Sequence, residues 1–532
     1  MSAAPDAPPH RGAATVVLCL GLFVLGLDLT ILNVAIPDLQ ADLSPPMAQV
    51  QWIVDGYALV LGGTVLAAGA VTDRMGRRRA FVLGLAVCGA TSVLGATATD
   101  PGHVVAARGG MGAGAALIMP ATLSVITHLY PEPALRRRAI AIWAAVGSAG
   151  GLTGPVLGGW LVEHFSWRAG FWINLPVAAV AITLAFWLVP ESRAPNPDRI
   201  DLIGAALSSL GLLALVWGII EAPTRGWASP PVLAAFTGSL LLLTAFLGWQ
   251  QRCRAPMLPL PLLRESRIAA GATALALMSF ALFGALFVIT LYLQGVLGFT
   301  PWEAGLHTLP LPGALGIGAL TALPLLARRD ERVAIALGLA LVTVAFAVLA
   351  GTGTASGYPR LAVFQLIAGF GAGLVAAAGT ESVMGAVPPD RAGLGSAIND
   401  ATRQVGSSLG VAVQGSLLTT FSSSRLHALT AHGNVPAEAV RALTGNPSPT
   451  ASAIAGVPAA GRLELLTAAR RSFVDAMAVT ATTAGAVTLA ATVGAAYWLL
   501  RPPTTRKHRS GPPGPVTGRR FATAARIVRE HE

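Results

Sequence analysis

A small set of ionisable residues stands inside otherwise apolar stretches of this chain. Asp28 is the only charged residue in the run FVLGLDLTILNVAIP, and no basic residue lies in the same apolar stretch. Comparable residues recur further along the chain: Asp55, Arg108, Glu381, Asp400 and Arg403. Ionisable groups in apolar surroundings are costly and commonly belong to proton relays or substrate paths, so these six residues are candidates for proton coupling or substrate binding.

Asp400 and Arg403 differ from the other candidates because they can neutralise each other. They stand three residues apart in AINDATRQVG and would share one face of a helix. A structural ion pair and a functional site are both compatible with this spacing. Asp28 has no such partner, and an aspartate at the centre of a membrane helix costs about 2.5–3.5 kcal/mol on insertion scales. We therefore expect Asp28 to face the interior of a helix bundle or a water-filled cavity.

The elements that must hold these residues are predicted to be membrane-spanning helices. Hydrophobic residues make up 54% of the 532 residues and charged residues only 11%, which is typical of a membrane protein. Apolar runs of about 20 residues, enough to cross a hydrocarbon layer of about 30 Å, recur along the chain. We count fourteen, beginning near residues 14, 51, 80, 104, 139, 168, 200, 231, 268, 304, 333, 359, 392 and 472. The sequence predicts an all-α integral membrane protein.

Three segments fall outside the predicted spans. They are a Pro-rich tail at 1–13, a Ser/Ala/Pro-rich loop at 422–470 and a basic tail at 501–532. The first apolar run lacks a small-residue cleavage site, so we expect it to be a retained span and not a signal peptide.

The distribution of basic residues predicts the orientation. With the N-terminus in the cytoplasm, 26 of the 36 lysine and arginine residues fall on cytoplasmic segments, as the positive-inside rule requires. An even number of spans then puts both termini in the cytoplasm. The net charge of +11 becomes a cytoplasmic surface that faces anionic lipid, and it does not indicate nucleic-acid binding.

Several enzyme classes are disfavoured by what the chain lacks. Its only lysine is Lys507, so a phosphate-binding loop with its obligatory lysine is absent. The three cysteines, Cys19, Cys88 and Cys253, are too scattered for a metal site or a disulfide framework. We expect no enzymatic activity, no metal and no cofactor; uphill transport would need an ion gradient or a partner.

The loop between the second and third predicted spans carries a concentrated motif. GAVTDRMGRRR, residues 69–79, resembles the cytoplasmic loop signature of the major facilitator superfamily. The resemblance is carried by Gly69, Asp73, Arg74, Gly76, Arg77 and Arg78. It implies a cytoplasmic gate, in which Gly69 permits close helix approach, Gly76 a tight turn, and Asp73 hydrogen bonds to a helix N-terminus or an arginine.

Other motifs follow in the family's order. RGGMGAGAAL from Arg108 resembles the span-four motif that the family links to proton coupling, and GSAGGLTGPVLGG at 147–159 resembles the antiporter motif of span five. That motif is carried by Gly147, Gly151, Gly154, Pro155, Gly158 and Gly159. Four further stretches resemble the fourteen-span drug/proton antiporter branch: LDLTILNVAIP, QWIVDGYAL, WRAGFWINLP and VPPDRAGLGSAINDATRQVGSSLGVAV.

The resemblance implies an architecture and a function. The fold would be two six-helix bundles, at 14–190 and 268–500, joined by two extra central helices within 191–267. The function would be proton-driven efflux of an amphipathic drug or antibiotic across the cytoplasmic membrane, conferring resistance. A proton-coupled uptake symporter for a small nutrient is the alternative. The identity of the transported compound is not predicted.

Overall fold

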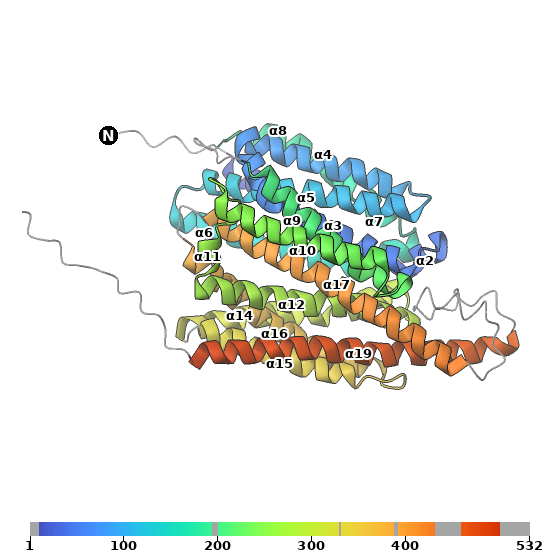
Figure 1. The fold of residues 1–532 in the computed structure, drawn as a ribbon. Helices are drawn as coiled ribbons and strands as arrows, with labels where there is room; N and C mark the ends of the chain where they lie inside the picture. Colours follow the sequence, from blue (N-terminus) through green and yellow to red (C-terminus); the bar gives the residue numbers. More distant parts are fainter. Residues whose placement is uncertain (1–9, 194–199, 329–330, 388–391, 431–458, 501–532) are drawn as a thin grey trace, which may run out of the picture.

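The computed structural model is a bundle of long helices lying side by side (Figure 1). It describes residues 10–193, 200–328, 331–387, 392–430 and 459–500, and within these ranges the regular structure is entirely helical. The N-terminal end of the first helix and the C-terminal end of the last lie at the same end of the bundle (Figure 1). We call this the terminal end and the opposite one the distal end.

The first half of the bundle crosses six times. Its helices are α1 (Arg11–Asp28), α2 (Ile31–Leu43), α3 (Met47–Met75), α4 (Arg77–Ala96), α5 (Pro101–Leu129), α6 (Pro133–His164), α7 (Ala169–Trp172) and α8 (Asn174–Leu188). The pairs α1–α2 and α7–α8 each make one broken crossing. The chain turns from α3 into α4 at Gly76, whose φ of 111° is strained for any residue with a Cβ.

The second half also crosses six times. Its helices are α12 (Ser266–Leu291), η1 (Tyr292–Val296), α13 (Pro301–His307), α14 (Pro310–Arg328), α15 (Glu331–Ala350), α16 (Gly357–Ala386), α17 (Ala392–Thr430) and α19 (Ala459–Leu500). Here α12 continues into η1, and α13 and α14 form one broken crossing.

Two inserted helices connect the halves: α9 (Leu202–Arg225) and α10 (Pro230–Arg252), followed by the short α11 (Leu260–Leu263). Asp201 caps α9 and is buried. Its Oδ1 accepts hydrogen bonds from Gly204 N at 2.8 Å and Trp249 Nε1 at 2.7 Å, and its Oδ2 from Gln250 Nε2 at 2.6 Å and Met257 N at 3.5 Å. One carboxylate therefore joins α9, α10 and the segment that leads to the second half.

The prediction of fourteen spans is confirmed. Thirteen of the described helices are long and apolar enough to cross a membrane, and α17 is the fourteenth. It is less apolar because it packs against α12 and α3 from opposite halves, so little of it needs to face lipid. Helix occupies both ends of the predicted 422–470 loop, because α17 runs to Thr430 and α19 starts at Ala459. The tails at 1–9 and 501–532 lie outside the described residues.

Each half has its own apolar core, and the cores join at the distal end. The first contains Phe81 and Phe171, and the second Phe346 and Phe364. Four residues of α2 and α3 belong to the core of the second half: Val34, Ile36, Met47 and Val50. Helix α2 forms the distal part of the first crossing, and Met47 and Val50 lie at the distal start of α3, so the halves pack together on this side.

Helix α9 covers the seam between α3 and α17. Ser209 Oγ donates to the Gly63 carbonyl at 2.9 Å, and Ser416 Oγ donates to the Ile219 carbonyl at 2.8 Å. A small apolar cluster that includes Leu59, Val216, Ile220 and Ala412 fills the same seam. The insertion thus contacts both halves.

Candidate functional site

Asp28 lies where the first crossing breaks. It is the last residue of α1, and the chain leaves helical geometry at Thr30 before α2 begins. Its carboxylate is 2% exposed and accepts a hydrogen bond from Asn174 Nδ2 at 2.8 Å. The same amide donates to Ser92 Oγ at 3.1 Å. The helix break and the start of α8 therefore place an acid and an amide together inside the first half.

Arg108 of α5 approaches Asp28 from another side. Its Nε donates to the Ile53 carbonyl at 2.9 Å, its guanidinium lies 4.7 Å from the centre of the Tyr57 ring, and its charge acts on Asp28. Arg108 is 2% exposed, and its Nη1 has no hydrogen-bond partner in the described chain. We call Asp28, Ser92, Arg108 and Asn174 the acid–arginine cluster.

The segment WRAGFWINLP explains how Asn174 reaches this position. At the distal end, Trp167 Nε1 and Arg168 Nη1 both donate to Asp42 Oδ2, at 3.0 and 2.6 Å. These hydrogen bonds lower the pKa of Asp42, which keeps the carboxylate ionised. Arg168 also donates to the Ala98 carbonyl at 3.0 Å. The start of the sixth crossing is anchored there, and Asn174 lies two turns further along.

Asp55 lies on a different face and does not join the acid–arginine cluster. It is 1% exposed, and its Oδ2 has no hydrogen-bond partner in the described chain. On α3 it shares a face with Gln51, which packs against Gly415, and with Gly62, which packs against Gln404. Asp55 therefore lies on the face of α3 that packs against α17, at the seam between the halves.

The three candidates of the second half are more exposed. Asp400 and Arg403 are both half-buried on α17. Asp400 accepts a hydrogen bond from Ser396 Oγ at 3.4 Å, while Arg403 acts on it by charge without a close ion pair. Glu381 is exposed near the terminal end of α16, where it and Arg267 lie beside Gly385. Glu381 therefore lies close to the terminal end of the bundle. Its neighbour Arg267 forms an ion pair with Glu331 at 2.7 Å.

The 69–79 loop is held by the first half. Asp73 pairs with Arg77 one turn away at 3.0 Å, and Arg77 also donates to the Ser124 carbonyl at 3.4 Å. Gly76 makes the expected tight turn. Gly69 is not at a close helix crossing, because a Cβ added there would meet Pro120 at an ordinary 3.9 Å.

Glu191 contacts this loop from the end of the sixth crossing, and the sequence analysis did not identify it as a site residue. Its Oε1 accepts from the Arg78 backbone N at 3.1 Å, and its Oε2 lies 3.9 Å from Arg78 Nε and 3.7 Å from Arg79 Nε. The sequence signal that could have identified Glu191 is its position, since it is a lone acidic residue directly after the sixth predicted span.

The glycine motif of α6 packs against the break in the first crossing. Gly154 lies against Thr30 and Gly158 against Ile31, where any Cβ would collide with the neighbouring chain. Thr30 Oγ1 donates to the Gly151 carbonyl at 3.0 Å. These contacts hold α6 against the turn that carries Asp28.

The same motif reaches the other half at the distal end. Gly159 packs against Pro301, and Gly305 against Pro155. Nearby, Trp302 N donates to Glu163 Oε2 at 3.2 Å, and Gln294 Nε2 donates to the Val34 carbonyl at 2.9 Å. The distal end is therefore closed by direct contacts between the halves in this structure.

The chain matches the family profile described as Major Facilitator Superfamily over residues 18–411. The chain belongs to this family. A bacterial homologue of the lysosomal transporter Spinster, in an inward-facing crystal structure, shares the major facilitator fold with a TM-score of 0.62 at 18% identity, covering 92% of this chain and 98% of that one.

Several relatives match over most of their length and of this chain. The chain is 31% identical to the tetracenomycin C resistance and export protein of Streptomyces glaucescens, covering 94% of each. It is 33% identical to the multidrug efflux pump LfrA of Mycolicibacterium smegmatis, covering 92% of this chain and 97% of that one. It is 34% identical to the puromycin resistance protein pur8 of Streptomyces alboniger, covering 82% and 88%. The predicted resemblance to this major facilitator family is confirmed.

Asn174 is the functional candidate that the sequence prediction missed. It stands in WRAGFWINLP, which was recognised as a motif, but an amide draws no attention by charge. Only the packing of α8 against α1 places its Nδ2 on Asp28.

Proposed function

We propose that this protein exports an amphipathic antibiotic or drug from the cytoplasm in exchange for protons and so confers resistance. It would work without a cofactor and without catalysing a reaction, in the cytoplasmic membrane, with both termini in the cytoplasm. The buried acid–arginine cluster carries the proposal, and its support comes from the family membership and from relatives named as resistance and export proteins.

The burial of the acids suggests a division of roles. Asp28 and Asp55 are almost completely enclosed, so a proton can reach them after a small rearrangement while a bulky compound cannot. Asp400 and Arg403 are half-buried beside the seam and are better placed to meet a substrate. Protons would bind Asp28 or Asp55, and the drug would bind nearer α17.

The contacts between the halves suggest which state this is. The distal end is sealed by Gly159, Gly305, Glu163 and Gln294, whereas the 69–79 loop is tied to its own half. If the terminal end is cytoplasmic, the closed distal end is what an inward-facing state requires. Export requires the distal contacts to part while the terminal ends close, which is the rocking motion expected of two such bundles.

Replacement of Asp28 by asparagine tests the proposal. Cells that produce the wild-type protein should resist a drug that the parent strain does not. In inside-out vesicles with an imposed proton gradient, addition of that drug should release protons from the lumen. D28N should abolish both effects, because asparagine keeps the shape but cannot exchange a proton.

The control is D100N, which alters an exposed carboxylate in the distal loop before α5. It should transport normally. Undiminished resistance with D28N at equal protein levels would refute the proposed role of Asp28. Accumulation of a sugar or organic acid without drug efflux would instead favour the uptake symporter.

A further inference from the structure

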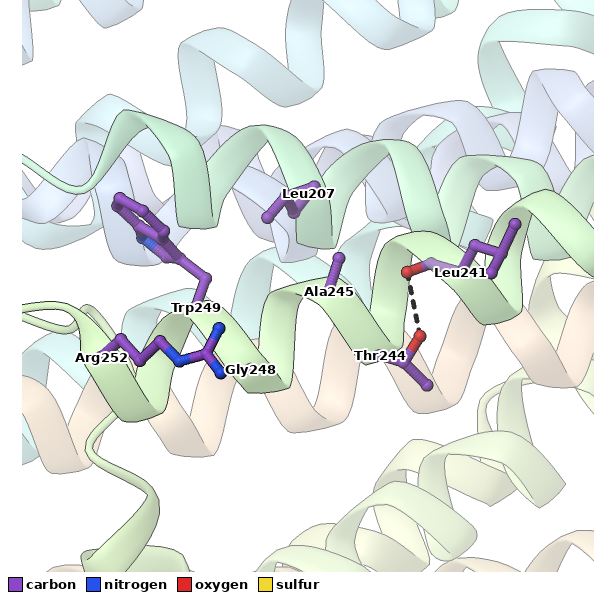
Figure 2. A pocket seen from close by; sticks show the side chains of 7 residues that line it. All are labelled: Leu207, Leu241, Thr244, Ala245, Gly248, Trp249 and Arg252. Atoms are coloured by element: carbon purple, nitrogen blue, oxygen red, sulfur yellow. Dashed lines mark hydrogen bonds between the residues drawn. The ribbon is translucent and has the colours of Figure 1, made fainter.

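The inserted hairpin carries a groove that contains none of the residues of the acid–arginine cluster. It lies between α9 and α10 (Figure 2) and has a volume of about 540 Å³. Its lining includes Leu207, Leu241, Ala245, Gly248, Trp249 and Arg252. The groove is therefore apolar along most of its length and cationic at one end.

The surroundings of the groove are suited to lipid. Helix α10 packs against α9, and it exposes several large apolar side chains outside the groove lining: Leu233, Leu240 and Leu247. In a protein that crosses a membrane, such a face contacts acyl chains. An apolar groove on this face is open to the same acyl chains.

The dimensions of the groove match one leaflet. Leu241 and Arg252 are eleven residues apart on α10, which is about 16 Å along a helix. Half of a hydrocarbon layer of about 30 Å is about 15 Å. An acyl chain lying in the groove would therefore place its headgroup at the level of Arg252, at the terminal end of the helix.

Arg252 is available to bind an anion. No carboxylate of the described chain pairs with it, and its side chain extends back towards Gly248 (Figure 2). Trp249 forms a fixed wall beside it, because its indole donates to Asp201 at 2.7 Å. A tryptophan and an unpaired arginine at the end of a span are the groups that membrane proteins place at headgroup level.

We propose that this groove binds one anionic phospholipid, with an acyl chain between α9 and α10 and the phosphate on Arg252. The concentration of basic residues at the terminal end would enrich anionic lipid around it. A zwitterionic lipid would gain the apolar contact but would have a weaker interaction with the guanidinium. A cationic amphipathic drug would be repelled by Arg252.

Two substitutions separate the two parts of the site. Arg252→Gln removes the charge and keeps most of the side-chain length. Gly248→Leu fills the groove, and its Cβ would meet no other atom within 4 Å, so the fold has room for it. Gly238→Leu is the matched control, since it makes the same change on the same helix, also with open space, and outside the groove lining.

Native mass spectrometry of the purified protein with added phosphatidylglycerol or phosphatidylcholine measures the result. We expect one tightly retained phosphatidylglycerol on the wild type and on Gly238→Leu. Arg252→Gln should bind it about fivefold more weakly, the factor expected for one basic residue near a membrane surface. Gly248→Leu should lose both lipids from this site.

Equal retention of phosphatidylglycerol by all four proteins would overturn the proposal. Equal binding of the two lipids to the wild type would overturn the assignment of the phosphate to Arg252. If Gly248→Leu loses a transported drug but keeps phosphatidylglycerol, the groove is a drug site and the proposal is wrong.

Discussion

Replacing Asp201 by asparagine should destabilise the junction between the insertion and the second half. An asparagine can accept hydrogen bonds only through its one oxygen, whereas the Asp201 carboxylate accepts through both. If that oxygen keeps Gly204 N and Trp249 Nε1, the new amide faces Gln250 Nε2, which now donates at 2.6 Å. Gln250 cannot turn over without a loss, because its Oε1 accepts from Leu258 N at 3.1 Å.

The magnitude follows from the bonds lost. A hydrogen bond to a charged group contributes about 1.5–3 kcal/mol, so losing the one from Gln250 should cost about that much. The contact with Met257 N, at 3.5 Å, is too long to add much. Replacement by alanine removes all three short hydrogen bonds and should cost roughly two to three times as much.

The cost should depend on pH with a defined sign. Burial acts to raise the pKa of Asp201, but the hydrogen bonds from Gly204, Trp249, Gln250 and Met257 lower it below its usual value. The carboxylate therefore stabilises the folded protein above the unfolded-state pKa of about 4, and this contribution is lost only as the pH falls below that value. Wild type and D201N should differ most at pH 7, and the difference should shrink progressively as the pH falls below about 4.

Thermal unfolding in detergent, followed by tryptophan fluorescence, provides the measurement, with protease cleavage within 253–258 as a local readout. D100N is again the matched control, because Asp100 also caps a helix but is exposed and accepts one hydrogen bond, from Gly102 N at 2.7 Å. It should cost little stability, because asparagine and aspartate cap a helix about equally well. Equal melting temperatures of D201N and wild type at pH 7 would refute this account of the junction.

Two further substitutions address the transport cycle. Asn174→Leu should reduce drug-driven proton release at least tenfold although Asp28 is intact, because the acid loses a charge-assisted hydrogen bond of about 1.5–3 kcal/mol inside the bundle. Gly159→Val should shift the protein away from the state described above, since its side chain would enter the backbone of Pro301 and part the halves at the distal end.

Each of these changes has a milder counterpart. Ser92→Ala removes only the second partner of Asn174 and should reduce proton release less than Asn174→Leu. Gly151→Ala should be tolerated, because its Cβ would lie 3.7 Å from the Gly26 carbonyl. Spin labels at Phe165 and Leu306 would report the distal separation, and an unchanged distance in Gly159→Val would contradict the closure assigned to this glycine.

The sequence by itself determined the all-helical class, the number of crossings and the family. These follow from local properties, because a run of about 20 apolar residues must form a helix to satisfy its backbone inside a membrane. The short motifs of α3, α5 and α6 were recognisable for the same reason, since each lies within one or two turns of chain. Gly76 could be predicted as a turn residue because its conformation depends on its own backbone.

Only the tertiary structure decided which polar groups meet. Asp28 and Asp55 are alike in the sequence, yet one faces Asn174 inside the first half and the other faces α17 across the seam. Asp400 and Arg403 have the spacing of an ion pair but do not form a close one. Glu191, Asn174 and Asp201 acquire their roles from partners on other helices or in distant segments. The identity of a side chain sets what it can bind, but the rotation and break of each helix determine which partner it reaches.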